Sequence, residues 1–213
     1  MDQSKSIEAR QRSARERGFS MIELCIVAVI FAIVSAIAIL QYRPALRVAD
    51  ADTAMRQVLD QLRQAREYAV ANRRYVQVTF PLDANNNPEI QITQKNSITN
   101  AAWADVVLST VHIQTPPTYT VLPAGMPDTP DGFGKASAIE FNGANAGAGG
   151  AELIYFQSDG ELVDSVTFLP VNGTVFLGGG AGSTAMPPRA VTVVGTTGRV
   201  RGWKSTNTGW IQF

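Results

Sequence analysis

The feature that most constrains the fold is a long apolar run near the amino end that contains a single carboxylate. It extends from Phe19 to Leu40, and Glu23 is the only charged residue among these 22 positions. At about 1.5 Å per residue, a helix of this length spans roughly 33 Å, which is enough to cross the hydrocarbon core of a bilayer. The run therefore predicts a membrane-spanning helix in which Glu23 needs an explanation.

Glu23 has two explanations in such a helix. A charged side chain costs about 2.5–3.5 kcal/mol at the centre of a bilayer on insertion scales, and less near an interface. Because Glu23 lies close to the start of the run, it could simply reach the lipid headgroups and have no further role. Alternatively, it has a positively charged partner that the apolar run itself does not provide.

Residues 1–18 are polar and basic, with five Lys or Arg residues against three acidic ones. The positive-inside rule predicts that this end stays in the cytoplasm and that the carboxyl side crosses the membrane. An ordinary secretory signal has a shorter apolar region, followed by a small-residue cleavage site. Residues 40–44 show no Ala-x-Ala pattern, so the sequence does not favour that route.

The junction between the basic segment and the apolar run carries a resemblance to a known family. Residues 18–23, GFSMIE, resemble the prepilin peptidase site of type IV pilins and type II secretion pseudopilins, with Ser20 where Thr is commoner. The resemblance implies cleavage between Gly18 and Phe19, methylation of the Phe19 amine, and pairing of Glu23 with the amine of a neighbouring subunit. It also implies three partners: prepilin peptidase, other pilins or pseudopilins in a filament, and an inner-membrane assembly platform.

Helical spacing continues beyond Pro44, which is expected to kink the helix rather than to end it. Apolar residues recur at intervals of three, four and seven: Val48, Met55, Val58, Leu59, Leu62, Ala65 and Ala69. This spacing predicts an amphipathic helix lying on a globular domain. The charged residues between them are expected to form its solvated face: Asp52, Arg56, Asp60, Arg63 and Arg66.

From Tyr75 onward, short alternating runs are separated by Gly, Pro, Asn and Asp. They predict strands at 76–80, 90–92, 106–113, 138–141, 153–156, 166–169, 174–177 and 191–194. Asp159-Gly160 predicts a turn, and loops are expected at 85–88, 142–150 and 178–183.

Together these elements predict an α+β, pilin-like fold, in which a long amino-terminal helix with a membrane-spanning first half packs on an antiparallel β domain. The expected divisions are a cleaved leader (1–18), a transmembrane and assembly helix (19–43), its amphipathic continuation (44–75) and a β-rich periplasmic domain (76–213). Within that domain, four segments resemble the GspH/FimT branch of minor pilins and pseudopilins: 156–160, 173–177, 191–194 and 197–201. Residues 96–134 match no part of that pattern.

Candidate catalytic residues are scarce. The chain has one cysteine, Cys25, and one histidine, His112. A disulfide within the chain is therefore impossible, and the absence of the disulfide-closed loop of many major pilins fits the GspH/FimT-like group. A Cys and His metal cluster is excluded, and a catalytic triad would have to use His112, which is expected to be an ordinary strand residue. The sequence predicts no enzymatic activity, no metal and no cofactor.

The charge distribution provides one further candidate site. From Tyr75 onward there are six basic and ten acidic side chains, and every acidic one lies at or before Asp164. The carboxyl-terminal part is therefore locally basic, and its candidate residues are Arg199, Arg201, Trp203 and Lys204. In an extended segment the two arginines lie on one side, where they could hold phosphates while Trp203 stacks on a base of DNA. Alternatively, they pair with acidic residues of the same domain or line a contact between subunits.

Three functions are compatible with these features. The preferred one is a minor pseudopilin of a type II secretion pseudopilus, acting in protein secretion. The second is a FimT-like minor pilin of a type IV pilus, acting in pilus assembly or in DNA binding and uptake. The third is a single-pass sensor or enzyme unrelated to filaments, which would retain residues 1–18. For the first two, we expect an inner-membrane protein with a cytoplasmic amino end and a periplasmic domain, which later moves into a periplasmic or surface filament.

Overall fold

The computed structural model describes residues 19–96, 105–113, 116–141, 144–146, 154–164, 167–180, 185–206 and 208–213. The chain divides into two compact units, Met1–Pro44 and Ala45–Phe213. Helix α2 (Met21–Asn72) contributes residues to both units, and Pro44 lies inside it. The predicted continuation of the helix beyond this proline is therefore confirmed.

In the first unit, the helix begins with the Leu24 amide donating to the carbonyl of Ser20 at 3.1 Å. The large apolar side chains between residues 19 and 39 are all strongly exposed, from 43% for Val27 to 86% for Met21. Among the described residues, α2 is the one helix that is long and apolar enough to cross a membrane. The apolar run therefore has no protein surface within the described part of the chain that covers it.

In the part of the second unit that the structure describes, the strands form two antiparallel sheets. The first has the order β3-β2-β1-β7-β8, and the second β12-β11-β10-β9-β5-β6, with β4 also paired to β9. The strands of the first sheet are β1 (Tyr75–Thr79), β2 (Glu89–Lys95), β3 (Val106–His112), β7 (Ile154–Phe156) and β8 (Leu162–Asp164). Those of the second are β4 (Thr118–Tyr119), β5 (Ile139–Phe141), β6 (Ala144–Ala146), β9 (Gly173–Gly179), β10 (Met186–Val194), β11 (Arg199–Thr206) and β12 (Gly209–Gln212). A 3-10 turn, η2 (Gly195–Thr197), joins β10 to β11.

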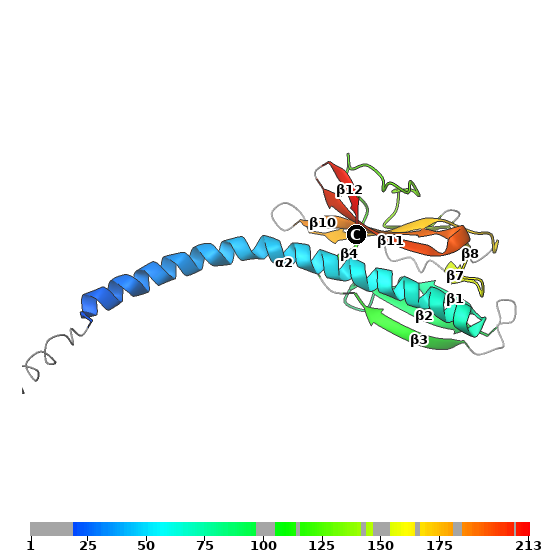
Figure 1. Ribbon diagram of the computed structural model, residues 1–213, viewed down its shortest axis with the longest axis horizontal. Coiled ribbons are helices and arrows are strands. Elements are labelled where there is room, and N and C mark those ends of the chain that lie inside the picture. Colours follow the sequence, from blue (N-terminus) through cyan, green and yellow to red (C-terminus); the bar gives the residue numbers. More distant parts are fainter. Residues whose placement is uncertain are drawn as a thin grey trace, which may run out of the picture. The chain divides into compact units, whose positions relative to one another are not determined.

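The carboxyl-terminal half of α2 supplies one side of the core of this unit, and Figure 1 shows it running along both sheets. Met55, Val58 and Leu62 are fully buried against residues of the two sheets. Ala65 and Ala69 are also fully buried, and their small side chains let the helix approach closely. The apolar residues recur at helical spacing because they lie on the buried face of the helix. The predicted α+β fold is confirmed. Val48 is an exception, because it is 44% exposed.

The strand expected at 166–169 is wrong within its described residues, 167–169. The strand lies earlier, at β8, and Asp164 at its end accepts hydrogen bonds from the Thr167 amide and hydroxyl at 2.7 and 3.0 Å. This turn places Phe168 at a positive φ of 53°. Its ring stacks on Tyr155, with ring centroids 6.2 Å apart. The apolar character that favoured a strand here therefore belongs to a turn.

Two loop predictions also need correction. Strand β6 lies inside the expected loop 142–150, and β9 extends through Gly178 and Gly179 at the start of the expected loop 178–183. Strand pairing orders these residues, because β6 pairs with β5, and the glycine-containing end of β9 pairs with both β4 and β10. The turn predicted at Asp159-Gly160 is confirmed between β7 and β8, where the Gly160 amide donates to the carbonyl of Gln157.

The last part of the segment that matched no family pattern, residues 120–134, covers part of the second sheet. Leu122 and Met126 belong to a small apolar cluster that also contains Phe176, Ala190, Trp203 and Trp210. Its position is fixed by the Trp210 indole, which donates to the Pro127 carbonyl at 2.9 Å. We refer to residues 120–134 as the covering segment.

Candidate functional site

The first candidate site is the start of α2. Gly18 and the rest of the leader lie outside the described residues, whereas Phe19 is described and is 79% exposed. Glu23 is exposed in the first helical turn, where the positive end of the helix dipole favours a carboxylate. Within the described residues, Glu23 has neither a hydrogen bond nor an ion pair. The site therefore presents one exposed carboxylate among exposed apolar side chains.

The second candidate site is the basic group on β11. Alternation along the strand places Arg199, Arg201 and Trp203 on one face, and Lys204 on the other. The structure therefore does not bring the four predicted residues together on one surface. Their individual surroundings differ as well.

Arg201 and Trp203 are held by the covering segment. The Arg201 guanidinium forms an ion pair with Asp131, whose side chain is 8% exposed. The Trp203 indole donates to the hydroxyl of Thr192 at 2.9 Å and to Asp131 at 3.2 Å, and the residue is 7% exposed. The expectation that Trp203 stacks on a DNA base is therefore not supported, because the protein itself covers the indole.

Lys204 faces helix α2. Its ammonium group lies 2.8 Å from Asp52 and 4.3 Å from the centroid of the Phe213 ring. Asp52 also binds the buried side chain of Arg189 at 2.7 Å. Burial opposes ionisation of Asp52, but the hydrogen bonds and positive charges of Lys204 and Arg189 outweigh it, so that the pKa of this carboxyl lies below its usual value. Asp52 is therefore an internal partner of two cations and not part of a solvated helix face.

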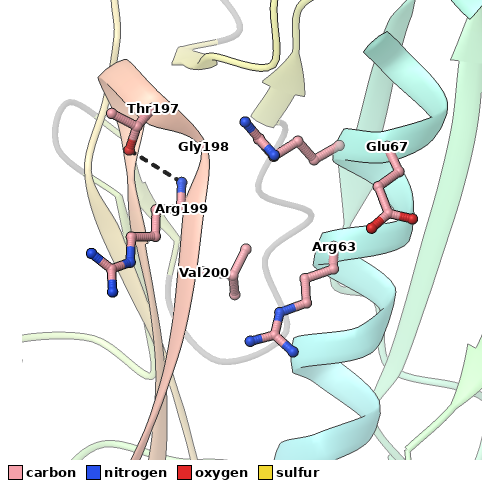
Figure 2. Close-up of a pocket in the computed structure, with 7 residues that line it drawn as sticks. Arg63, Glu67, Thr197, Gly198, Arg199 and Val200 are labelled. Atoms are coloured by element: carbon pink, nitrogen blue, oxygen red, sulfur yellow. Dashed lines mark hydrogen bonds between the residues drawn. The ribbon is translucent and has the colours of Figure 1, made fainter. Parts of the chain in front are cut away.

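Arg199 is the member of the group that stays exposed. It lies at a cavity of about 420 Å³ whose wall also includes Arg63, Arg66, Glu67 and Thr197. Figure 2 shows Arg63 directed from α2 toward β11, whereas the Arg199 guanidinium is directed away from the helix. The proximity of Arg63 and Arg199 to one cavity could not be predicted from the sequence, because the two residues lie 136 positions apart and share no periodicity.

Two glycines shape this cavity. Gly198 has a φ of +59°, and a Cβ there would lie 2.0 Å from the carbonyl oxygen of Gly160. The Arg66 side chain lies against the same two residues and donates to the Gly160 carbonyl at 3.3 Å. Only glycine permits this approach of the two turns, which fixes where the Arg66 guanidinium can lie.

The histidine has closer polar neighbours than the sequence indicated. His112 ends β3, and its Nδ1 atom lies 2.8 Å from Glu89 Oε1. Asp83 offers a third ligand atom within 4.8 Å of these two. This group differs from the excluded Cys and His cluster, because its other members are carboxylates.

Comparisons with known proteins point to the amino-terminal site. Residues 13–39 match the family model described as the prokaryotic N-terminal methylation motif. Neither a search of the curated proteins nor a search of the solved structures found a match. The motif implies processing by prepilin peptidase and assembly into filaments with other pilins. This motif coincides with the start of the exposed apolar helix, and it indicates a type IV pilin-like protein or pseudopilin.

Proposed function

We propose that the chain is a minor pseudopilin, a structural subunit of a type II secretion pseudopilus that acts in protein secretion. The observation that carries this proposal is Glu23, an exposed carboxylate without a partner in the described residues, four positions after Phe19 and within an exposed apolar helix. Cleavage between Gly18 and Phe19 creates a new amine, which is then methylated. The Glu23 carboxylate of one subunit pairs with this amine of its neighbour during assembly.

The physical reason for this pairing is mutual compensation of charge. A lone carboxylate among apolar helices is costly, and so is a lone ammonium group. When one subunit supplies each, the two charges satisfy one another and fix the stagger between adjacent helices. The basic leader holds the amino end in the cytoplasm and the β domain in the periplasm before assembly. The inner-membrane assembly platform then moves the subunit into the filament.

The interior of the β domain supports a structural role. Arg189, Arg201 and Lys204 are each paired with a carboxylate of the same chain. Their charges therefore hold the helix, the second sheet and the covering segment together. We assign a minor subunit of the GspH/FimT branch for two reasons. The chain lacks a second cysteine, and several of its sequence segments resemble that branch.

Mass spectrometry of the native amino terminus tests the proposal most directly. Protein recovered from its host is expected to begin at a methylated Phe19. A chain that retains residues 1–18 would instead point to a membrane-anchored sensor or enzyme, and would overturn the proposal.

A Glu23→Leu variant tests the pairing. We expect normal membrane insertion, because the change removes a charge from an apolar run. We expect little or no incorporation into the filament, measured by the amount of subunit in sheared filament fractions. Ser35→Leu is the matched control, because it also replaces a polar residue of the run without removing a charge. Equal incorporation of both variants would contradict the assigned role of Glu23.

The second candidate is a FimT-like minor pilin that binds DNA, and one observation favours it. Arg63, Arg66 and Arg199 line the same cavity, and two of them are exposed. Proteins that bind DNA strongly make 6–10 contacts to phosphates. Three arginines provide fewer contacts, so we expect the chain to bind DNA weakly and in a salt-dependent manner. We expect the gel shift to be lost in the double variant Arg63→Ala, Arg199→Ala and to be retained in the control Arg74→Ala, which removes an exposed arginine outside the cavity wall. Deletion of the gene separates the systems, because a pseudopilin is required for secretion of exported enzymes and a FimT-like pilin for piliation or DNA uptake.

A further inference from the structure

A second polar group lies at one end of the first sheet, where the connection between β1 and β2 meets the end of β3. Asp83 is in this connection, Glu89 begins β2 and His112 ends β3. Glu89 and His112 are direct cross-strand partners. One ligand atom from each of the three residues lies within 4.8 Å of the other two.

The charges of this group do not balance. Two carboxylates face one imidazole, so that even a protonated imidazole leaves one negative charge within the group. The Glu89 side chain is only 15% exposed, whereas the imidazole is 68% exposed and can adjust its position. An external cation would therefore complete the group.

Asp83 is positioned in advance by its own loop. Its Oδ1 atom accepts hydrogen bonds from the amides of Asn85 and Asn87 at 2.7 and 2.8 Å, and its Oδ2 atom accepts one from the Asn87 side chain at 2.9 Å. These three bonds fix the orientation of the Asp83 carboxyl group. Two bonds fill the lone pairs of Oδ1, and Oδ2 retains one for another partner.

We propose that Asp83, Glu89 and His112 form a binding site for a divalent transition metal of the zinc class. One imidazole nitrogen and two carboxylate oxygens suit Zn²⁺, with water completing the fourth position. Ca²⁺ prefers oxygen ligands alone, and the imidazole therefore favours the softer ion. Ligand atoms in a tetrahedral zinc site lie about 3.3 Å from one another. His112 Nδ1 and Glu89 Oε1, which are 2.8 Å apart, would therefore have to move apart only slightly to bind one ion. Bound metal would join the loop that carries Asp83 to the end of β3.

The single histidine makes the test specific. The full chain, labelled with ¹⁵N and held in detergent micelles without an affinity tag, is titrated with zinc chloride after treatment with a chelator. We expect one zinc ion per chain, a shift of the His112 Nδ1 resonance with little change at Nε2, and a higher midpoint of thermal unfolding. No saturable binding, or ligation through Nε2, would overturn the proposal.

Ligand variants provide the second readout. Asp83→Asn keeps an oxygen acceptor for the loop amides but loses the negative charge, and Glu89→Gln preserves side-chain size. Loss of a group that merely orients a ligand weakens metal affinity by about 10–100-fold, so each variant is expected to bind zinc at least tenfold more weakly in calorimetry. Asp159→Asn is the matched control, because Asp159 also accepts a turn amide, from Glu161 at 3.0 Å. If Asp83→Asn binds zinc as tightly as this control, the assigned ligands are wrong.

Discussion

The two halves of helix α2 share one backbone conformation but have opposite surroundings. Before Pro44, its large apolar side chains are exposed, and Leu24 retains 66% of its accessible surface. After Pro44, a stripe of apolar residues is fully buried, with Leu62 at 0%. Both halves are helical because their backbone hydrogen bonds are internal to the helix. Within the described residues, the apolar side chains of the first half are not covered by protein, whereas those of the second half are packed in the core.

The strongest test of this comparison is a pair of equivalent truncations. Leu62→Ala removes a buried side chain from the core and should lower the free energy of unfolding of the β domain by about 2–5 kcal/mol. Leu24→Ala makes the same chemical change at an exposed position and should leave that free energy unchanged. Urea unfolding of the full chain in detergent, followed by tryptophan fluorescence, measures both. Similar losses for the two variants would show that the halves do not differ as described.

A second test concerns the polar contact that joins the buried half to the second sheet. Asp52→Ala leaves Arg189, which is 3% exposed, without its carboxylate, and also deprives Lys204 of its partner. Because an unpaired buried charge is costly, we expect a loss of about 2–4 kcal/mol. Asp60→Ala is the control, because Asp60 is exposed on the same half of the helix and should change stability by less than about 0.5 kcal/mol. If Asp60→Ala lowered the free energy of unfolding as much as Asp52→Ala, the contacts of Asp52 with Arg189 and Lys204 would not explain the loss.

A third test addresses the opposite face of the second sheet. Asp131→Asn weakens the ion pair with Arg201 and the contact with the Trp203 indole. We expect a loss of about 1–3 kcal/mol, since buried donors are left poorly satisfied. A red shift of the native fluorescence would show that the covering segment no longer excludes water from Trp203. An unchanged spectrum together with unchanged stability would contradict the anchoring role of Asp131.

The smallest expected effect is on acid stability. Because the folded pKa of Asp52 lies below its ordinary value of 3.8, its ionised form stabilises the fold fully above that value. This contribution declines as the pH falls below 3.8 and is lost once the pH is below the folded pKa. The difference in unfolding free energy between the native chain and Asp52→Asn should therefore narrow with acidification below about pH 4. A difference that stays constant down to pH 2 would exclude this linkage.

Much of the architecture could be predicted because periodicity reports burial. The spacing of Met55, Leu62 and Ala69 indicated the buried stripe, and alternation indicated most of the longer strands. The prediction of a strand at 166–169 was wrong because Phe168 is an apolar residue of a turn. Composition alone does not distinguish such a residue from an apolar residue of a strand.

The candidate sites were harder to predict, because they depend on contacts across the chain. Alternation placed Arg201 and Trp203 on one face but could not show that the covering segment, which lacks periodicity, would occupy that face through Asp131. In the same way, Asp83 and His112 lie 29 positions apart and meet only through the pairing of β2 with β3. The amino-terminal motif could be read from the sequence because it occupies one short contiguous segment, residues 13–39.

The continuity of α2 through Pro44 has a consequence for how a subunit could leave a lipid bilayer. In the apolar half, the peptide groups form hydrogen bonds within the helix, except at its end and beside the proline. Passage from hydrocarbon into a packed protein assembly therefore requires no exchange of main-chain partners. Most of its side chains move between two media of similar polarity. Extraction would then depend chiefly on the solvation of one ionisable group, Glu23.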